Sequence, residues 1–290
     1  MRIGHMSDSS GPLPDSSRIG RTALTVGDES AVIDFYRNTV GLEQLTREAS
    51  TTTLGVDRRS LLEVRYDAAA RPRPEDATGL FHNAFRVPSR AALGDALARV
   101  RDGWVLTGAS DHGVSEALYC TDPEGNGVEL YRDRPQEDWP RDDDGSLEIG
   151  SWPLDLVDLA AAASDGPVST VPAETSLGHV HLEVSSLEDA CEFYVDTLGF
   201  DVMDTAPSAV FLAVGGYHHH LGLNTWHRRS VPPTADHCGL AWFELVVPSS
   251  DALETVRRRL EDDDVPVDKT DDGVRITDPD GIAIRIVAEP

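Results

Sequence analysis

The sequence predicts an α+β fold in which four βαβββ modules form two cupped mixed sheets. Two repeated motifs carry this prediction, because an internal repeat marks a unit of structure that recurs along the chain. A Phe-Tyr-x-x-Thr-x-Gly string in residues 35–41 recurs in residues 193–199, with an offset of 158. A Thr-Asp-Pro-acidic-Gly string in residues 121–125 recurs in residues 277–281, with an offset of 156. Since the two offsets nearly agree, we infer that one half of the chain duplicates the other and that each half holds two modules.

Each module is expected to open with a strand and continue with a helix. Apolar and polar residues that alternate predict the opening strands, for example residues 21–26, 82–87 and 179–184. A polar start followed by apolar residues spaced near 3.6 predicts the helices, in residues 28–38, 89–101, 186–196 and 249–261. Gly41 and Gly199 follow two of these helices, where a left-handed cap favours glycine.

Three short strands complete each module, and the turns at residues 122–125 and 278–281 separate strands of this kind. A polar crossover with a short helix near residues 154–163 lies between the second and third modules. A chain of 290 residues is long enough for two domains. The expected organisation is a disordered leader (1–17), an N-terminal pair of modules (18–135), a crossover linker (136–176) and a C-terminal pair of modules (177–290).

The composition argues against a secreted or membrane protein. No apolar run approaches the roughly 18–20 residues that span a bilayer, and the N-terminal segment has no apolar stretch typical of a secretory signal. Cys120 and Cys191, two of the three cysteines, fall in a predicted strand and a predicted helix, and no CxxC pair is present. We therefore expect a cytoplasmic protein whose cysteines are reduced packing residues.

The net charge is -26, and Lys269 is the only lysine among 25 basic residues. Such an acidic chain repels nucleic acid, which excludes that class of partner. Abundant aspartate with almost no lysine predicts a salt-adapted surface. Preference for arginine codons in a high-GC genome is the alternative explanation.

One stretch of the second module carries a specific signature. His112 is followed at fixed spacing by Leu118-Tyr119, Asp122-Pro123, Gly125 and Glu129. With the four modules, this pattern resembles the extradiol ring-cleaving dioxygenases of the catechol 2,3-dioxygenase kind, in the vicinal oxygen chelate superfamily. The resemblance covers almost the whole chain after residue 17 and implies the glyoxalase/bleomycin-resistance/extradiol dioxygenase fold. Ser110 is the one departure from the signature.

The resemblance implies an Fe(II) site held by His82, His179 and Glu129, with Mn(II) as the alternative metal. The residue types agree, because imidazole and carboxylate ligands suit Fe(II) or Mn(II), and the absence of thiolates argues against a structural zinc site. His181 competes with His179, since it lies two residues on and faces the same side of the strand. His179 is preferred because His82 and His179 each begin the same His-x-x-apolar-x-Val string.

The resemblance also implies a set of catalytic residues. The run of residues 217–222 resembles the family's His-x-x-small motif, in which His219 is the acid–base. The run is expected to lie on the last strand of its module, where His218 and His220 point the opposite way from His219, so an error of one residue would change the assignment. His112 and Tyr119 match positions that hydrogen-bond substrate and oxygen. Trp226, His227 and the loop of residues 228–233 are candidates for shaping the substrate pocket.

The repeat also predicts how the modules pair. The offset of 156 places Arg285 where Glu129 stands and Arg275 where Tyr119 stands, and the offset of 158 places Arg21 where His179 stands. Aligning Val87-Pro88 with Val247-Pro248 places Trp242 where His82 stands. The ligands therefore lie in the second and third modules alone. We infer that these two modules pair to form the metal-binding cup, and that the first and fourth pair around a cup without metal.

The expected function is extradiol cleavage of a catechol-type diol by O2 at mononuclear Fe(II), giving a 2-hydroxymuconic semialdehyde type product. The partners are then a small aromatic diol and O2, and homo-oligomerisation is left open. Three alternatives remain: a hydroquinone-cleaving dioxygenase, a metal-dependent isomerase or lyase of the glyoxalase kind, and a non-catalytic protein that binds a small aromatic.

Overall fold

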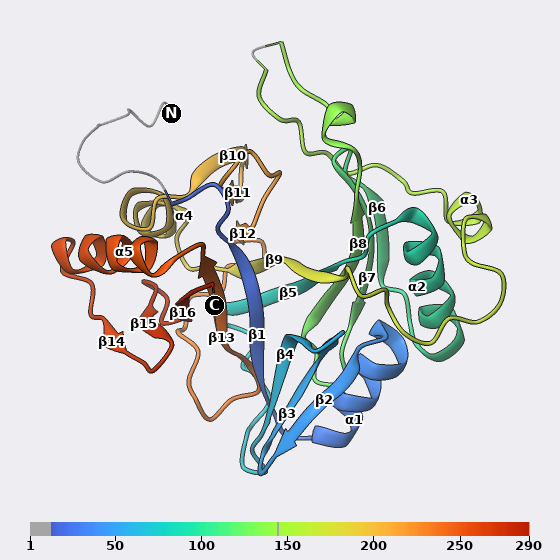
Figure 1. Ribbon diagram of the computed structural model, residues 1–290, viewed down its shortest axis with the longest axis horizontal. Coiled ribbons are helices and arrows are strands. Elements are labelled where there is room, and N and C mark those ends of the chain that lie inside the picture. Colours follow the sequence, from blue (N-terminus) through green and yellow to red (C-terminus); the bar gives the residue numbers. More distant parts are fainter. Residues whose placement is uncertain (1–12, 144, 290) are drawn as a thin grey trace.

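Four βαβββ modules follow one another along the chain in the computed structural model, which describes residues 13–143 and 145–289 (Figure 1). The first comprises β1 (Arg18–Val26), α1 (Glu29–Phe35), β2 (Glu43–Glu48), β3 (Thr51–Val56) and β4 (Arg59–Tyr66). The second comprises β5 (Gly79–Arg86), α2 (Arg90–Gly103), β6 (Gly108–Asp111), β7 (Ser115–Thr121) and β8 (Gly127–Asp133). The third comprises β9 (Ser176–Glu183), α4 (Leu187–Cys191), β10 (Asp201–Ala206), β11 (Ala209–Ala213) and β12 (Leu221–Asn224). The fourth comprises β13 (Gly239–Val247), α5 (Ser250–Asp262), β14 (Asp268–Lys269), β15 (Gly273–Thr277) and β16 (Ala283–Ala288). The predicted fold class is confirmed.

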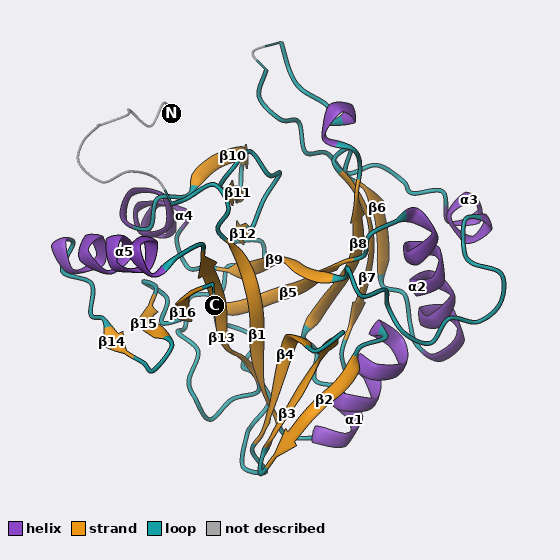
Figure 2. Cartoon of the chain, in the orientation of Figure 1, coloured by secondary structure: helices purple, strands orange, loops and turns teal. Residues whose placement is uncertain are grey.

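Two eight-stranded mixed sheets arise from these modules, and each sheet takes one module from each half of the chain. One sheet has the order β10-β11-β12-β9-β5-β8-β7-β6, and the other has the order β14-β15-β16-β13-β1-β4-β3-β2. The central strands β5 and β9 pair antiparallel in the first sheet, as β1 and β13 do in the second. The second module thus pairs with the third and the first with the fourth, as the distribution of ligands predicted. In Figure 2 the strands fill the middle of the molecule and the helices lie on its outside.

The registers of the two sheets match the offsets found in the sequence. Tyr119 lies opposite Glu129 in the first sheet, and Arg275 lies opposite Arg285 in the second. His181 lies opposite His82 in the first sheet, and its counterpart Ala23 lies opposite Trp242 in the second. Equivalent positions in the two halves therefore occupy equivalent places in two sheets.

The helices begin where predicted, but two of them end differently. Asp28, Ser89, Ser186 and Ser249 cap the four helix N-termini by accepting a backbone N–H hydrogen bond. Two helices, predicted to run regularly through residues 28–38 and 186–196, change into π-helical turns at Tyr36–Val40 and Glu192–Thr197. Gly41 has φ of 92° and Gly199 has φ of 90°, so both take the left-handed conformation that was expected after these helices.

A buried Tyr–Asp hydrogen bond joins the two modules within each half. The hydroxyl of Tyr36, in the π-helical turn of the first module, donates to Asp122 in the turn between β7 and β8, at 3.4 Å. Tyr194 donates to Asp278 at 2.9 Å in the same way between the third and fourth modules. Contacts between a helix and a turn therefore connect the two modules within each half. The shared sheets connect one half of the chain to the other.

The segments outside the modules pack against them. Leu13 is 2% exposed and its N–H donates to the carbonyl of Gly199, so residues 13–17 are ordered where a disordered leader was expected. Residues 1–12 of that leader lie outside the described residues. The crossover between the halves contains a short helix, α3 (Leu156–Ala161), close to the predicted 154–163. No helix in the described ranges is long and apolar enough to cross a bilayer.

Candidate metal centre and its cavity

Three side chains converge on one point of the sheet that the second and third modules form. His82 on β5, Glu129 on β8 and His179 on β9 belong to three adjacent strands. Glu129 Oε2 lies 2.9 Å from His82 Nε2 and 3.2 Å from His179 Nε2, and the two imidazole nitrogens are 3.3 Å apart. All three residues are buried. The structure therefore brings together the three predicted ligands, and it is His179 that meets the other two.

The protonation of this cluster favours a bound cation. Burial alone would raise the pKa of Glu129, but the charges and hydrogen bonds of His179 and His82 outweigh it and hold that pKa well below its ordinary value. Burial lowers the pKa of His179 to about 4. One carboxylate and two imidazoles form a donor set that fits a divalent metal such as Fe(II) or Mn(II).

A cavity of about 510 Å³ opens over the three ligands. Apolar side chains make up much of its wall, and polar groups gather near the ligands. Lining residues are Phe81, His82, Ser110, His112, Tyr119, Glu129, Ile149, Gly150, Ser151, His179, His181, Ala206, Ala209, Phe211, His219 and Trp226. All six predicted site residues are in this set.

His112 and Tyr119 form a hydrogen-bonded pair on the cavity wall. His112 Nδ1 donates to the carbonyl oxygen of Gly150 at 2.6 Å, and its Nε2 lies 2.7 Å from the hydroxyl oxygen of Tyr119. Burial and the neighbouring Glu129 carboxylate raise the pKa of Tyr119 well above its ordinary value. Tyr119 therefore stays a neutral hydroxyl beside the metal ligands.

The three consecutive histidines differ from the expected strand. Residues 217–220 form a loop before β12, so the alternation of a strand does not apply to them. Instead the rings of His218 and His219 touch, with their Nδ1 atoms 2.7 Å apart. Among the three, His219 alone lines the cavity, whereas His220 accepts a hydrogen bond from the Val214 backbone N–H. The position of His219 agrees with the prediction, although the local structure that creates it does not.

The comparisons with known proteins bear on the whole chain. A family model described as the glyoxalase/bleomycin resistance protein/dioxygenase superfamily matches residues 18–130 and 176–286. The chain belongs to this superfamily. A superfamily relative from Bacillus subtilis (strain 168), named Catechol-2,3-dioxygenase, is 37% identical over 270 residues, which cover 91% of this chain and 95% of the relative. A second, from Pseudomonas putida and named 3-methylcatechol 2,3-dioxygenase, is 23% identical and aligns over 70% of this chain and 66% of its own length.

Solved structures of the superfamily fold resemble the protein over most of its length. A candidate dioxygenase from Bacillus subtilis has a TM-score of 0.66 with 12% identity, covering 97% of this chain and 87% of its own. Glyoxalase I from Zea mays has a TM-score of 0.58 with 17% identity, covering 94% and 92%. At these identities the likeness shows the fold alone.

Part of the cavity wall comes from the crossover linker, which the sequence did not reveal. Ile149, Gly150 and Ser151 lie in this linker and close the cavity above His112. Ser151 Oγ lies 2.8 Å from Ser110 Oγ, so the residue that departs from the superfamily signature contacts the linker. A polar segment without periodicity carries no signal of such a role. Trp226 lines the cavity as suspected, whereas His227 pairs with Glu183 outside the lining set.

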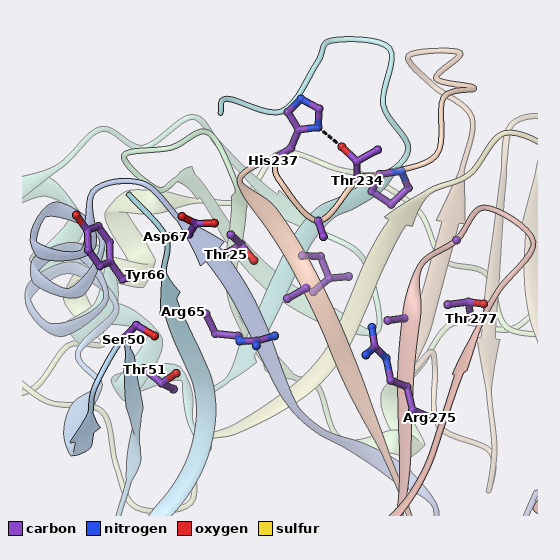
Figure 3. Close-up of a pocket in the computed structure, with 16 residues that line it drawn as sticks. Thr25, Ser50, Thr51, Arg65, Tyr66, Asp67, Thr234, His237, Arg275 and Thr277 are labelled. Atoms are coloured by element: carbon purple, nitrogen blue, oxygen red, sulfur yellow. Dashed lines mark hydrogen bonds between the residues drawn. The ribbon is translucent and has the colours of Figure 1, made fainter. Parts of the chain in front are cut away.

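In the cup of the first and fourth modules, arginines and a tryptophan occupy the positions equivalent to the candidate ligands. Arg21 and Arg285 lie over the ring of Trp242, at 5.5 and 4.8 Å from its centroid, and Arg21 pairs with Glu244 at 3.2 Å. Two guanidinium groups therefore stand where a metal cation would be held. A polar cavity of about 530 Å³ remains in this cup, with Arg65 and Arg275 reaching over its floor from opposite sides (Figure 3).

Proposed function

We propose that the protein is an Fe(II)-dependent extradiol dioxygenase that cleaves catechol-type diols. The observation that carries this proposal is the buried set of His82, His179 and Glu129 at one wall of a largely apolar cavity, with His219 and the pair of His112 and Tyr119 beside it. The 37% identity to a relative named Catechol-2,3-dioxygenase supports the same reaction.

His82, His179 and Glu129 would hold the metal at the wall of the cavity. When bound there, Fe(II) supplies coordination sites for the diol and O2 and the electron transfer between them. Because Glu129 is the only carboxylate among the cavity-lining residues, the site carries little negative charge beyond what the metal offsets. A catechol can then bind as an anion without strong repulsion.

The other residues orient the diol and move its protons. Phe81, Phe211 and Trp226 offer ring faces and edges that fit a flat aromatic and exclude water. His219 lines the cavity with the ligands and takes a proton from a diol hydroxyl. Burial and the neighbouring histidines hold its pKa well below the ordinary value, so the ring is neutral before the diol binds. His112 and Tyr119 hydrogen-bond oxygen atoms that gain negative charge during the reaction.

Ring opening next to the diol gives a product of the 2-hydroxymuconic semialdehyde type, in which both atoms of O2 are incorporated. A hydroquinone-cleaving dioxygenase would use the same ligands on a diol of different geometry. An isomerase of the glyoxalase kind would need a further acidic ligand, and the one three-ligand group found among the described residues contains a single carboxylate.

The test is reconstitution with Fe(II) without air, followed by catechol and then air. We expect a yellow product and the uptake of one O2 per diol. The matched control is the His82→Ala variant treated in the same way, which should give neither. Cleavage of hydroquinone but not catechol would replace the proposal by its nearest rival, and no O2 uptake with either diol would refute a dioxygenase.

A further inference from the structure

A chain of buried hydrogen bonds leads from His219 away from the cavity. His219 Nδ1 lies 2.7 Å from His218 Nδ1, and His218 Nε2 lies 2.9 Å from Asp133 Oδ1. His218 is fully buried and does not line the cavity. Asp133, at the end of β8, is 22% exposed in its side chain. The chain therefore begins at the proposed acid–base and ends at the protein surface.

The charge on Asp133 decides which atoms carry hydrogen. Burial alone would raise its pKa, but His218, Arg86 and Tyr217 outweigh that effect and hold the pKa below its ordinary value. Arg86 donates to Oδ2 at 3.2 Å, while the Tyr217 hydroxyl lies 3.1 Å from Oδ1. An ionised carboxylate only accepts hydrogen bonds. His218 must therefore donate from Nε2, and in its neutral form it accepts at Nδ1.

The orientation of His219 follows from that of His218. Because His218 Nδ1 accepts, His219 Nδ1 carries the hydrogen and donates it. Nε2 of a neutral His219 then has a free lone pair, and no hydrogen bond joins this atom to the described residues. Since His219 lines the cavity, this nitrogen is the one available to a substrate hydroxyl.

We propose that His218 and Asp133 are positioning residues that fix the tautomer of His219. The inference rests on the proposed acid–base role of His219. With Asp133 accepting from His218 Nε2–H and His218 Nδ1 accepting from His219 Nδ1–H, the lone pair on His219 Nε2 is left for a substrate hydroxyl in the cavity.

The decisive variant is Asp133→Asn. Arg86 requires an oxygen at its side of residue 133, so the new amide must place its NH2 group toward His218 Nε2. His218 would then accept at Nε2 and donate from Nδ1, which forces His219 to carry its hydrogen on Nε2. Nitrogen-15 NMR of the imidazoles distinguishes the two tautomers in the full chain without any turnover. We expect Nδ1–H at His219 in the unmodified protein and Nε2–H in the variant.

Two further variants serve as controls for this measurement. Glu116→Gln also removes a buried carboxylate that is paired with arginine in the same sheet, at Arg90 and Arg132, but it lies outside the chain of hydrogen bonds. It should leave the His219 tautomer unchanged. His218→Gln keeps an acceptor for His219 Nδ1–H, so the tautomer should stay as it is in the unmodified protein. This second variant also serves if Asp133→Asn does not fold.

Turnover of the iron-loaded variants completes the test. We expect kcat to fall by about 10²–10⁴-fold in Asp133→Asn, with KM within about threefold and iron content unchanged. An unchanged tautomer or a wild-type kcat in Asp133→Asn, or an altered tautomer in His218→Gln, would overturn the inference. If the tautomer inverts but the unmodified protein cleaves no diol, the positioning stands and the proposed function fails.

Discussion

His179 and His181 lie two residues apart on β9 and line the same cavity, yet only His179 meets Glu129. The sequence distinguished them through the repeated His-x-x-apolar-x-Val string, because equivalent positions in paired modules occupy equivalent places in the sheet. His181 instead packs its ring against Phe81 and Trp226, and its Nε2 has no hydrogen-bond partner among the described residues. The position of the ligand was thus predictable from the register of the repeat. The role of the linker residues Ile149 and Ser151 was not predictable, because the linker has no counterpart in the repeat.

The first prediction concerns the ligands. His82→Ala, His179→Ala and Glu129→Ala should each lose bound iron and keep the fold, because each removes one of three donors. Metal analysis together with far-ultraviolet circular dichroism measures both properties. His227→Ala, which changes a histidine outside the cavity lining, is the matched control and should keep its iron. Wild-type iron content in the His179 variant would reassign that ligand to His181.

The second prediction concerns proton transfer. His219→Gln should keep iron and lower kcat by about 10²–10⁴-fold, the usual contribution of a positioned acid–base group. His220→Gln alters the neighbouring histidine, which does not line the cavity, and should change kcat little. Steady-state kinetics of the two iron-loaded variants makes the comparison. Full activity in the first and a large loss in the second would move the acid–base by one residue.

At the scale of elements, the alternation of apolar and polar residues predicted the opening strands well, and the capping residues predicted where the helices begin. The π-helical turns were not predicted, because the apolar spacing that indicates a helix does not specify the hydrogen-bonding pattern of its last turn. The loop of residues 217–220 was mistaken for a strand because it is short and borders β12. Gly215 and Gly216, both with positive φ, mark the turn that precedes it and were the available signal.

The turn between β15 and β16 gives a prediction about pH. Burial, with a contribution from the charge of Asp280, raises the pKa of Asp278 to about 7. The folded state then binds a proton that the unfolded chain releases above about pH 4, so stability falls as pH rises from about 4 to 7. Asp278→Asn keeps the acceptor oxygen for the backbone N–H groups of Asp280 and Ile282 but cannot ionise.

We therefore expect Asp278→Asn to be more stable than the unmodified protein at pH 8, by at most about 4 kcal/mol, and to match it near pH 4. Denaturant unfolding at several pH values measures the difference. If both proteins lost the same stability between pH 4 and pH 8, Asp278 would have to be ionised throughout.

At the scale of the whole molecule, the net charge of -26 concerns the surface and not the site. Many acidic side chains are exposed, and some pair with arginine, as Glu254 and Glu261 do with Arg257 on α5. Such exposed pairs contribute little each, so most of the repulsion is left for salt to screen. The Debye length falls from about 30 Å at 0.01 M salt to about 3 Å at 1 M.

We predict that the melting temperature rises with KCl into the molar range, and that dialysis into low salt releases iron. Calorimetry at 0.1 M and 2 M KCl makes the measurement. The same melting temperature at both KCl concentrations would refute the prediction of a salt-adapted surface. Codon preference would then be the explanation for the scarcity of lysine. The dioxygenase proposal would be untouched, because it depends on the modules.

The pairing of modules across the two halves also sets the order in which the protein can assemble on the ribosome. The strands of the metal-binding sheet have all been made once β12 ends at Asn224, before β13 begins at Gly239. β1, by contrast, must wait for a partner more than 200 residues downstream. At a synthesis rate of about 5–20 residues per second, that wait lasts on the order of 10–40 seconds. During it, one edge of β1 is an open template for wrong pairing. The strands around the candidate metal centre are therefore complete before translation ends, while the sheet of the first and fourth modules is the one exposed longest to wrong pairing.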